Sequence, residues 1–351
     1  MKVYCCQCGF EGHEIVTHLR EEHNLSVFDY LSTFASAPVV SDELMYGLPV
    51  KLLKPKERDI PVYEKVTHRI GDWEVEGFAE PSHLTPRIDT SYKFPPETEL
   101  LINGIRHGDK SLLVGPTGCG KSQLIIQLAA QTNTPLIRFN LHGETSVSNF
   151  VGHWVVQGKE MIFVEGVLPR AMKNGYWLLM DELDACTPQV SFLLHSVLEE
   201  KGSLVMADKD GEVVEPHPDF RIIATANTIG KGEDSGLYSG TQILNEAFLD
   251  RFATIISLSY LPFDSEVSVI LEKVSIEPVI AAGMTQVASE IRRAFDEETV
   301  YSTFSTRRLV NWARKFSTLG DIKKASEIAI LNRLSTDDRK VVEEVIQRYF
   351  G

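Results

Sequence analysis

The segment Gly115–Ser122 reads GPTGCGKS and decides the fold of the chain. It follows a short apolar run at residues 111–114 (SLLV) and precedes a helical pattern at 123–131. A strand, a glycine-rich turn and a helix in this order are typical of a phosphate-binding loop. Its glycines let backbone amides turn toward phosphates, and the helix N-terminus adds partial positive charge. We expect nucleotide contacts from Gly115, Pro116, Thr117, Gly118, Cys119, Gly120, Lys121, Ser122 and Gln123.

Two later strand ends supply the polar groups that such a loop needs. YWLLM ends in Asp181 and Glu182, and IIATA ends in Asn227. We expect Lys121 to reach the β- and γ-phosphates of ATP, and Ser122 and Asp181 to hold Mg²⁺. Glu182 is suited to polarise the attacking water, and Asn227 to orient it. The pattern predicts an ATPase that uses ATP and Mg²⁺.

Two arginine positions complete the predicted site. Arg251, in FLDRF, follows a short helical segment. An Arg beside an Asp is usually a surface ion pair of small consequence, but in this order of motifs we interpret Arg251 as an arginine finger that reaches the γ-phosphate on a neighbouring subunit. FSTRRLVNWAR places Arg307 and Arg308 at the start of a later helix, and we prefer Arg307 as the nucleotide contact.

The order of elements predicts an α/β fold with a parallel sheet. Short apolar runs at 111–114, 136–140, 177–180, 221–225 and 254–258 alternate with helical patterns, which is typical of a parallel sheet covered by helices. After Pro262 the pattern is helical only, at 264–274, 285–298, 306–318, 321–333 and 336–349. We expect four parts: a zinc finger at 1–35, a proline-rich connector with short strands such as 72–78 at 36–90, an ATPase core at 91–262 and a helical lid at 263–351.

These motifs resemble those of the AAA+ ATPases, and within them the MoxR branch. PHPDFRIIATANTIGKGEDSGLYSGTQILNEAFLDRF at 216–252 is similar to the CobS type, the ATPase subunit of aerobic cobaltochelatase, as are IDTSY at 88–92, GVLPRA at 166–171 and YLP at 260–262. The resemblance implies a homo-oligomeric ring, usually hexameric, with ATP at the subunit interfaces. It also implies a partner with a von Willebrand A-type domain, as in CobT.

Two insertions have the alternation of β-hairpins. One spans 152–166 with its tip at 157–159, and interrupts a helix; the other spans 203–217 and turns at Asp210-Gly211. In related rings such hairpins face the central pore. The alternative is that both only complete the edge of the subunit.

The N-terminal segment YCCQCGFEGHEIVTHLREEHN, at residues 4–24, has the ligand pattern of a zinc site. Cys5, Cys8, His18 and His23 offer two thiolates and two imidazoles, the set that tetrahedral Zn²⁺ prefers. The spacing resembles the prokaryotic Ros/MucR zinc finger, a small ββα fold. Cys6 remains as a substitute for Cys5, and a chance grouping of Cys and His is the other alternative.

The charge of this segment opposes DNA binding. Residues 1–35 carry two basic side chains, Lys2 and Arg20, against five acidic ones. Affinity for duplex DNA rests largely on neutralised phosphates. We therefore expect the finger to dock a protein client, with DNA binding as the less favoured alternative.

Bulk composition sets the remaining expectations. The formal net charge is −14, and the five cysteines are too few for a disulfide scaffold in 351 residues. The chain has neither an apolar run that could span a membrane nor a signal peptide, so we expect a cytoplasmic protein.

Three functions are compatible with these residues. The first is an ATP-hydrolysing ring motor that remodels a partner protein or complex. The second is the ATPase subunit of a cobaltochelatase, which inserts cobalt in a corrin precursor. The third is a nucleic-acid-associated ATPase recruited by the zinc finger.

Overall fold

The computed structural model describes residues 3–4, 11–12, 16–23, 63–157, 160–228 and 244–351. Its contacts divide the chain into two units, Met1–Ile60 and Pro61–Gly351. In the first unit, strands β1 (Val3–Tyr4) and β2 (Glu11–Gly12) pair antiparallel and precede helix α1 (Val16–Glu22). Leu19 of α1 is fully buried.

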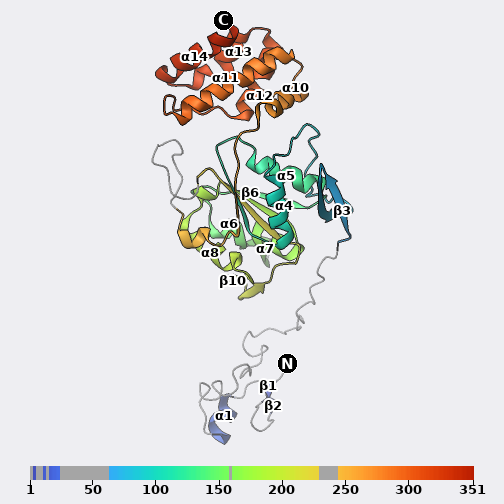
Figure 1. Ribbon diagram of the computed structural model, residues 1–351. Helices are drawn as coiled ribbons and strands as arrows, with labels where there is room; N and C mark the ends of the chain where they lie inside the picture. Colours follow the sequence, from blue (N-terminus) through green and yellow to red (C-terminus); the bar gives the residue numbers. More distant parts are fainter. Residues whose placement is uncertain (1–2, 5–10, 13–15, 24–62, 158–159, 229–243) are drawn as a thin grey trace. The chain divides into compact units, whose positions relative to one another are not determined.

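The second unit is built on a five-stranded parallel sheet (Figure 1). The strand order is β13-β5-β12-β9-β6, so the strand before the phosphate-binding loop, β5, lies between β13 and β12. The strands are β5 (Ser111–Val114), β6 (Leu136–Asn140), β9 (Trp177–Asp181), β12 (Arg221–Ala226) and β13 (Thr254–Ser257). The α/β fold and the parallel sheet predicted from the sequence are confirmed, with strand ends within one residue of the expected ones.

Both faces of the sheet are buried under helices. Because successive side chains point to opposite faces, each strand contributes to the core on both sides. On β5, Leu112 and Val114 pack into the cluster under α6, α7 and α8, whereas Leu113 packs with residues of α4 and α5 on the other face. The helices of this part are α4 (Thr98–His107), α5 (Lys121–Gln131), α6 (Val147–Val151), α7 (Val167–Asn174), the 3₁₀ turn η1 (Leu183–Ala185), α8 (Pro188–Leu198) and α9 (Glu246–Leu249).

The described part of the proline-rich segment packs on the sheet domain. Its hairpin joins β3 (Lys65–Ile70) to β4 (Trp73–Phe78), and the strand expected at 72–78 is therefore β4. Ile70 and Val75 belong to the same hydrophobic cluster as α4 and α5. The backbone N–H of Phe78 donates to the carbonyl of Thr132 at 2.9 Å. Residues 24–62 lie outside the described part of the chain.

Both insertions expected as hairpins form them. β7 (Gly152–Gln157) pairs with β8 (Glu160–Glu165), between α6 and α7, and β10 (Leu204–Met206) pairs with β11 (Glu212–Val214). Asp210 and Gly211 have φ values of 51° and 71°, the left-handed conformation that the expected turn requires. The expected tip residues Gly158 and Lys159 lie outside the described residues.

The C-terminal helices enclose a second hydrophobic core around Trp312 and Phe304. They are α10 (Phe263–Lys273), α11 (Pro278–Asp296), α12 (Thr306–Leu319), α13 (Ile322–Ala329), η2 (Leu331–Arg333) and α14 (Thr336–Phe350).

Two predicted helix boundaries in this part were wrong. Helix α11 begins at Pro278 rather than at 285, because proline at a first helical position needs no N–H partner. The helix expected at 321–333 ends at Ala329, and the 3₁₀ turn η2 follows.

Among the described residues, no helix has the length and apolar character needed to cross a membrane.

Candidate nucleotide-binding site

The phosphate-binding loop joins the end of β5 to the start of α5. Gly120 directly precedes α5 and has a φ of 108°, a backbone conformation that residues other than glycine rarely adopt. Gly118 has φ of 73°, and a Cβ atom there would lie 2.4 Å from the Cβ of Ser305. The loop therefore needs glycine at 120 for its turn and at 118 for the close approach of the residue that caps α12.

Lys121 holds the loop through its ammonium group. Its Nζ donates to the carbonyls of Gly115 at 2.6 Å and Pro116 at 3.1 Å, and to Oδ1 of Asn227 at 3.0 Å. The side chain is largely buried, and this desolvation lowers the lysine pKa. Lys121 thus brings a positive charge into a site where few waters can screen it.

Asp181 lies at the end of β9 and is 1% exposed. Its Oδ1 accepts hydrogen bonds from Ser122 Oγ at 2.5 Å and Thr225 Oγ1 at 2.8 Å. Its Oδ2 accepts from Arg138 Nε at 2.5 Å. The predicted magnesium residues Ser122 and Asp181 are therefore in direct contact, and their oxygens form the donor set that Mg²⁺ takes in such loops.

Glu182 and Asn227 stand at the same end of the sheet as Asp181. Glu182 has φ of 59°, a left-handed conformation that ends the strand. The buried Asp184 carboxylate accepts hydrogen bonds from the backbone N–H groups of Asn227 at 2.8 Å and Thr228 at 3.2 Å. Asp184 thereby fixes the backbone of Asn227, whose side-chain oxygen meets Lys121.

These groups line a cleft of about 610 Å³ that also includes residues of α10 and α12. Arg307 lines it, together with Arg314 of the same helix. Arg308 is directed elsewhere: its guanidinium lies 5.6 Å from the Phe304 ring, and burial lowers its pKa to about 10. Of the two arginines considered from the sequence, the preferred Arg307 is the one at the cleft.

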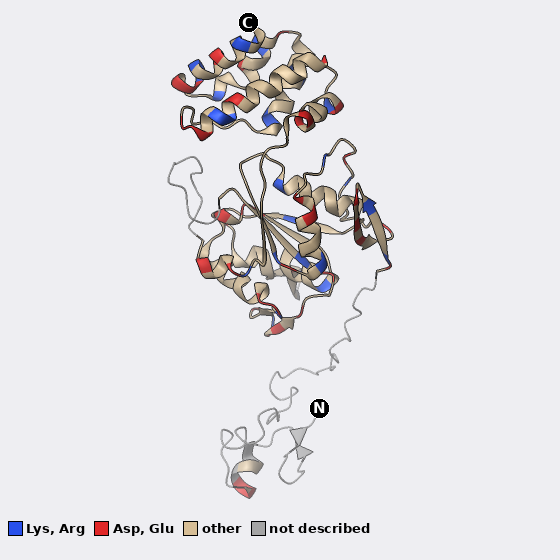
Figure 2. Cartoon of the chain, viewed as in Figure 1, with Lys and Arg blue, Asp and Glu red and all other residues tan. Residues whose placement is uncertain are grey.

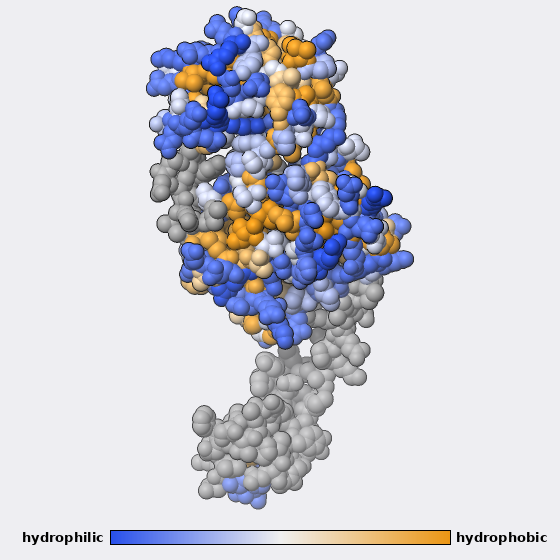
Figure 3. Space-filling model, in the orientation of Figure 1, coloured by the Kyte–Doolittle hydropathy of each residue, from blue (hydrophilic) through white to orange (hydrophobic). Residues whose placement is uncertain are grey.

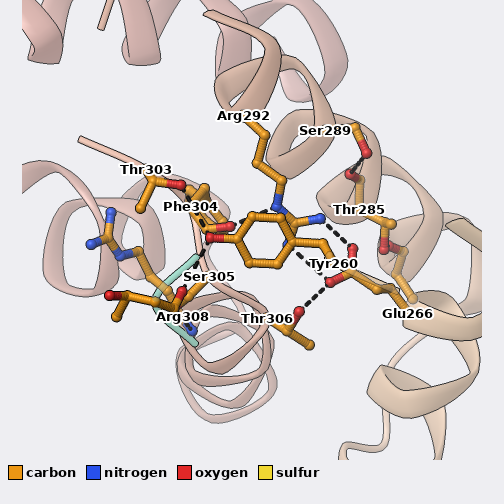
Figure 4. A network of polar contacts seen from close by, with 12 residues as sticks. Tyr260, Glu266, Thr285, Ser289, Arg292, Thr303, Phe304, Ser305, Thr306 and Arg308 are labelled. Atoms are coloured by element: carbon orange, nitrogen blue, oxygen red, sulfur yellow. Dashed lines mark hydrogen bonds and ion pairs between the residues drawn. The ribbon is translucent and has the colours of Figure 1, made fainter. Parts of the chain in front are cut away.

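A polar network connects the loop with the helical part (Figure 4). The Tyr260 hydroxyl donates to the Thr117 carbonyl at 3.1 Å, and the Tyr260 ring lies 3.8 Å from the Arg292 guanidinium. Arg292 pairs with Glu266 at 2.7 and 2.9 Å, and Glu266 accepts from the hydroxyl of Thr306, the residue before Arg307.

A second connection lies at the rim of the cleft. The carboxylate of Asp89, in the IDTSY segment, accepts from Lys273 Nζ of α10 at 2.7 Å and from Ser91 Oγ at 2.5 Å. The hydrogen bond from Lys273 lowers the pKa of Asp89, and those from Ser91 add to the effect. The sheet domain and the helices thus meet through the Tyr260–Thr117 hydrogen bond and through the ion pair of Asp89 and Lys273 at the cleft.

Family models and relatives agree with this architecture. Residues 110–252 match the AAA domain (dynein-related subfamily), and residues 266–349 match the CbbQ/NirQ/NorQ C-terminal family. The chain is 36% identical over 290 residues to "Aerobic cobaltochelatase subunit CobS" of Sinorhizobium sp., which covers 80% of this chain and 87% of the relative. The chain is a AAA+ ATPase of the CbbQ/NorQ/MoxR-like family.

Other relatives are more distant. This AAA+ ATPase is 28% identical over 233 residues to NorQ of Paracoccus denitrificans, covering 66% of this chain and 81% of NorQ. A solved structure of a putative ATPase from Cytophaga hutchinsonii covers 72% of this chain and 88% of that chain, with 20% identity and a TM-score of 0.40.

Arg251 of the AAA+ ATPase does not line the cleft. Its guanidinium pairs with Glu199 at 2.7 and 3.0 Å and also donates to the Ala247 carbonyl. The structure therefore separates Arg251 from the other predicted catalytic residues Lys121, Asp181, Glu182, Asn227 and Arg307.

Sequence reasoning missed other polar residues of the cleft, among them Arg138, Asn140, Thr225 and Arg314. It also missed the buried Asp184, which holds the backbone of Asn227. Arg138 and Asn140 alternate on β6, whose neighbour is β9, and Asn140 pairs in register with Asp181. Polar residues at alternate positions of an otherwise apolar strand were the available signal.

The predicted zinc ligands are only partly described. His18 and His23 lie on and just after α1, with their Nε2 atoms 3.1 Å apart. Cys5 and Cys8 lie outside the described residues, as does the segment 229–243 with its GLYSGTQ motif. Within the described ranges, no group of three or more His, Cys, Asp and Glu could hold a metal ion.

Proposed function

We propose that this AAA+ ATPase hydrolyses ATP to ADP and phosphate in a ring of identical subunits, hexameric by analogy with its family, and uses the energy to remodel a partner protein or complex. The observation that carries the proposal is the cleft in which Lys121, Asp181, Glu182 and Arg307 meet, lined by both the sheet domain and the helices. A site of this kind couples the state of the nucleotide to the position of the helices.

Each residue has a role that follows from its chemistry. Lys121 neutralises the β- and γ-phosphates, and Ser122 with Asp181 holds Mg²⁺, which supplies further charge neutralisation when bound. Glu182 accepts the proton of the attacking water, and Asn227 orients that water. Arg307 contacts the nucleotide from the helical side, so hydrolysis changes what holds α12 to the core.

The position of Arg251 supports a shared site. This arginine lies outside its own cleft, so in the proposed ring it serves the γ-phosphate of the adjacent subunit. Large apolar side chains on the surface support assembly as well, because monomers rarely expose many of them together. Figure 3 shows hydrophobic side chains on the visible surface of the core, and the exposed residues include Phe192, Val156, Met161 and Val205.

Mixed rings test this arrangement directly. Glu182→Gln and Arg251→Ala subunits are each expected to be inactive alone. Mixed together, they form interfaces that combine an intact Glu182 on one subunit with an intact Arg251 on the next, so ATPase activity returns. Mixtures that stay inactive, or an Arg251→Ala monomer with full activity, would overturn the shared site.

We propose further that residues 1–35 form a zinc finger that docks a protein client. Two imidazole nitrogens bound to one tetrahedral zinc at ~2.0–2.1 Å lie about 3.3 Å apart, and the 3.1 Å between His18 and His23 supports that geometry. Zinc would crosslink α1 to the segment with Cys5 and Cys8. Comparing proteins that co-purify with the full chain and with a chain lacking residues 1–35 identifies the client.

A second candidate is supported by the identity with CobS: the ATPase subunit of a cobaltochelatase, working with a CobT-like von Willebrand A-type partner. ATP-dependent insertion of Co²⁺ in a corrin precursor, assayed with the partner subunits of the same host, tests it. Cobalt insertion that proceeds without this chain would exclude the second candidate.

Nucleic acid is the less favoured partner. Acidic and basic residues are interspersed over the helices of the second unit (Figure 2), and the whole chain has a net charge of −14. Strong stimulation of the ATPase by DNA or RNA at physiological salt would favour nucleic acid over a protein client.

A further inference from the structure

Arg138 lies on the edge strand of the sheet, β6, where it lines the nucleotide cleft. It lies on β6, two residues before Asn140, which pairs in register with Asp181. Its Nε donates to Asp181 Oδ2 at 2.5 Å, while 52% of the Arg138 side chain remains exposed. The guanidinium therefore touches the buried carboxylate with one edge and lines the cleft with the rest.

The Asp181 carboxylate accepts hydrogen bonds from three side chains. Ser122 and Thr225 donate to Oδ1, and Arg138 donates to Oδ2. A buried carboxylate without a positive partner is costly, and Arg138 supplies that charge within the protein itself. Mg²⁺ held by Ser122 and Asp181 would bring two further positive charges to the same carboxylate. The metal ion and the Arg138 guanidinium would then repel each other.

We propose that Arg138 is a positioning residue that couples Mg²⁺ to nucleotide. Its guanidinium neutralises the charge of the Asp181 carboxylate and repels Mg²⁺, and the part of it that lines the cleft attracts the phosphates. Nucleotide binding then depends less on Mg²⁺ than it would without Arg138. This inference rests on the proposed function, because it takes ATP and Mg²⁺ as the ligands of the cleft.

The test measures binding rather than activity. In a Glu182→Gln background, the dissociation constant of fluorescent ADP is measured in excess Mg²⁺ and in EDTA, for the parent and for Arg138→Gln. Removing Arg138 is expected to weaken binding in EDTA and to spare it in Mg²⁺. The ratio of the dissociation constant in EDTA to that in Mg²⁺ should therefore rise about tenfold, the size of an ordinary coupling between two ligands.

Two further variants separate charge from structure. Arg138→Lys keeps the charge and should keep most of the parent's ratio. Arg170→Gln is the control: it removes an exposed arginine of α7 that lies outside the cleft, so the ratio should not change. As a second readout without nucleotide, Mg²⁺ should raise the melting temperature of Arg138→Gln more than that of the parent.

The outcomes distinguish this inference from the proposed function. A ratio that does not change in Arg138→Gln, or that changes equally in Arg170→Gln, overturns the role of Arg138 and leaves the ATPase standing. A parent that binds ADP neither with Mg²⁺ nor without it overturns the proposed function and this inference with it.

Discussion

Arg292 of α11 donates hydrogen bonds to both carboxylate oxygens of Glu266 in α10, at 2.7 and 2.9 Å, and its guanidinium stacks on the ring of Tyr260. Glu266 is 1% exposed and Arg292 11% exposed as side chains. The pair links the first two helices after the sheet domain, and Tyr260 extends the contact to the phosphate-binding loop through the Thr117 carbonyl.

Breaking this pair should strongly destabilise the fold. Arg292→Met leaves the buried Glu266 carboxylate without its charged partner, which costs about 3–5 kcal/mol of unfolding free energy. Chemical denaturation measures the loss. The matched control is Arg293→Met, because Arg293 is 71% exposed and 3.8 Å from Glu297, and exposed pairs contribute at most about 1 kcal/mol. Equal effects of the two substitutions would contradict the prediction.

Lys121 and Glu182 should separate nucleotide binding from hydrolysis. Lys121→Ala removes the buried positive charge of the loop and is expected to abolish ATP binding. Glu182→Gln keeps the shape of the site but cannot accept a proton, so it should bind ATP and hydrolyse it ~10²–10⁴-fold more slowly. Equilibrium binding and phosphate release measure the two effects, with the exposed Lys201→Ala as control. Unimpaired hydrolysis by Glu182→Gln would exclude Glu182 as the base.

The ion pair of Asp89 and Lys273 should stabilise the fold above the ordinary pKa of Asp, 3.8. The pKa of Asp89 is lower in the folded chain than in the unfolded chain, so the carboxylate stabilises the fold when ionised, and the contribution fades as the pH falls below 3.8. Asp89→Asn should therefore cost up to about 1 kcal/mol at pH 7 and less in acid. Urea denaturation at a series of pH values measures this, and a cost that grows toward low pH would contradict it.

The two hairpins should be coupled by a cluster of four charges. Glu165, at the end of β8, accepts hydrogen bonds from Lys173 at 2.5 Å and Lys209 at 2.7 Å, and Glu212 of β11 pairs with the same two lysines. Burial raises the pKa of Glu165, but these hydrogen bonds outweigh burial and lower it. Trp154 of β7 adds a hydrogen bond to the Asp208 carbonyl at 2.7 Å.

A double-mutant cycle measures that coupling. Glu165→Gln and Lys209→Met should be non-additive in unfolding free energy by about 0.5–3 kcal/mol, as expected of residues in one network. The control cycle uses Asp337 and Lys340, an exposed pair 3.8 Å apart that should show little coupling. Similar coupling in both cycles would mean that the hairpins are not held together by this cluster.

Zinc content should depend on Cys5 and Cys8. Serine at either position removes a thiolate from the four expected ligands, so the purified chain should lose its zinc, as measured by elemental analysis. Cys6→Ser is the matched control, adjacent in sequence and outside the expected set. Loss of zinc from Cys6→Ser with retention in Cys5→Ser would assign the ligand to Cys6 instead.

The sequence by itself determined the elements whose signals are local. The phosphate-binding loop needs a strand, three glycines and a helix start within a few residues, and all of them stand between 111 and 131. The parallel strands are similarly local, because burial on both faces makes each a short continuous apolar run. The zinc finger and the subunit ring stay predictions.

Only the tertiary structure decided which distant side chains meet. Arg138, Ser122 and Thr225 reach the same Asp181 carboxylate from three different elements, 43 to 59 positions away in the chain. The choice between Arg307 and Arg308 at the cleft depends on which face of α12 packs against the core. Sequence spacing cannot specify these contacts, because they follow from strand order and helix packing, which are set by the burial of the whole apolar surface.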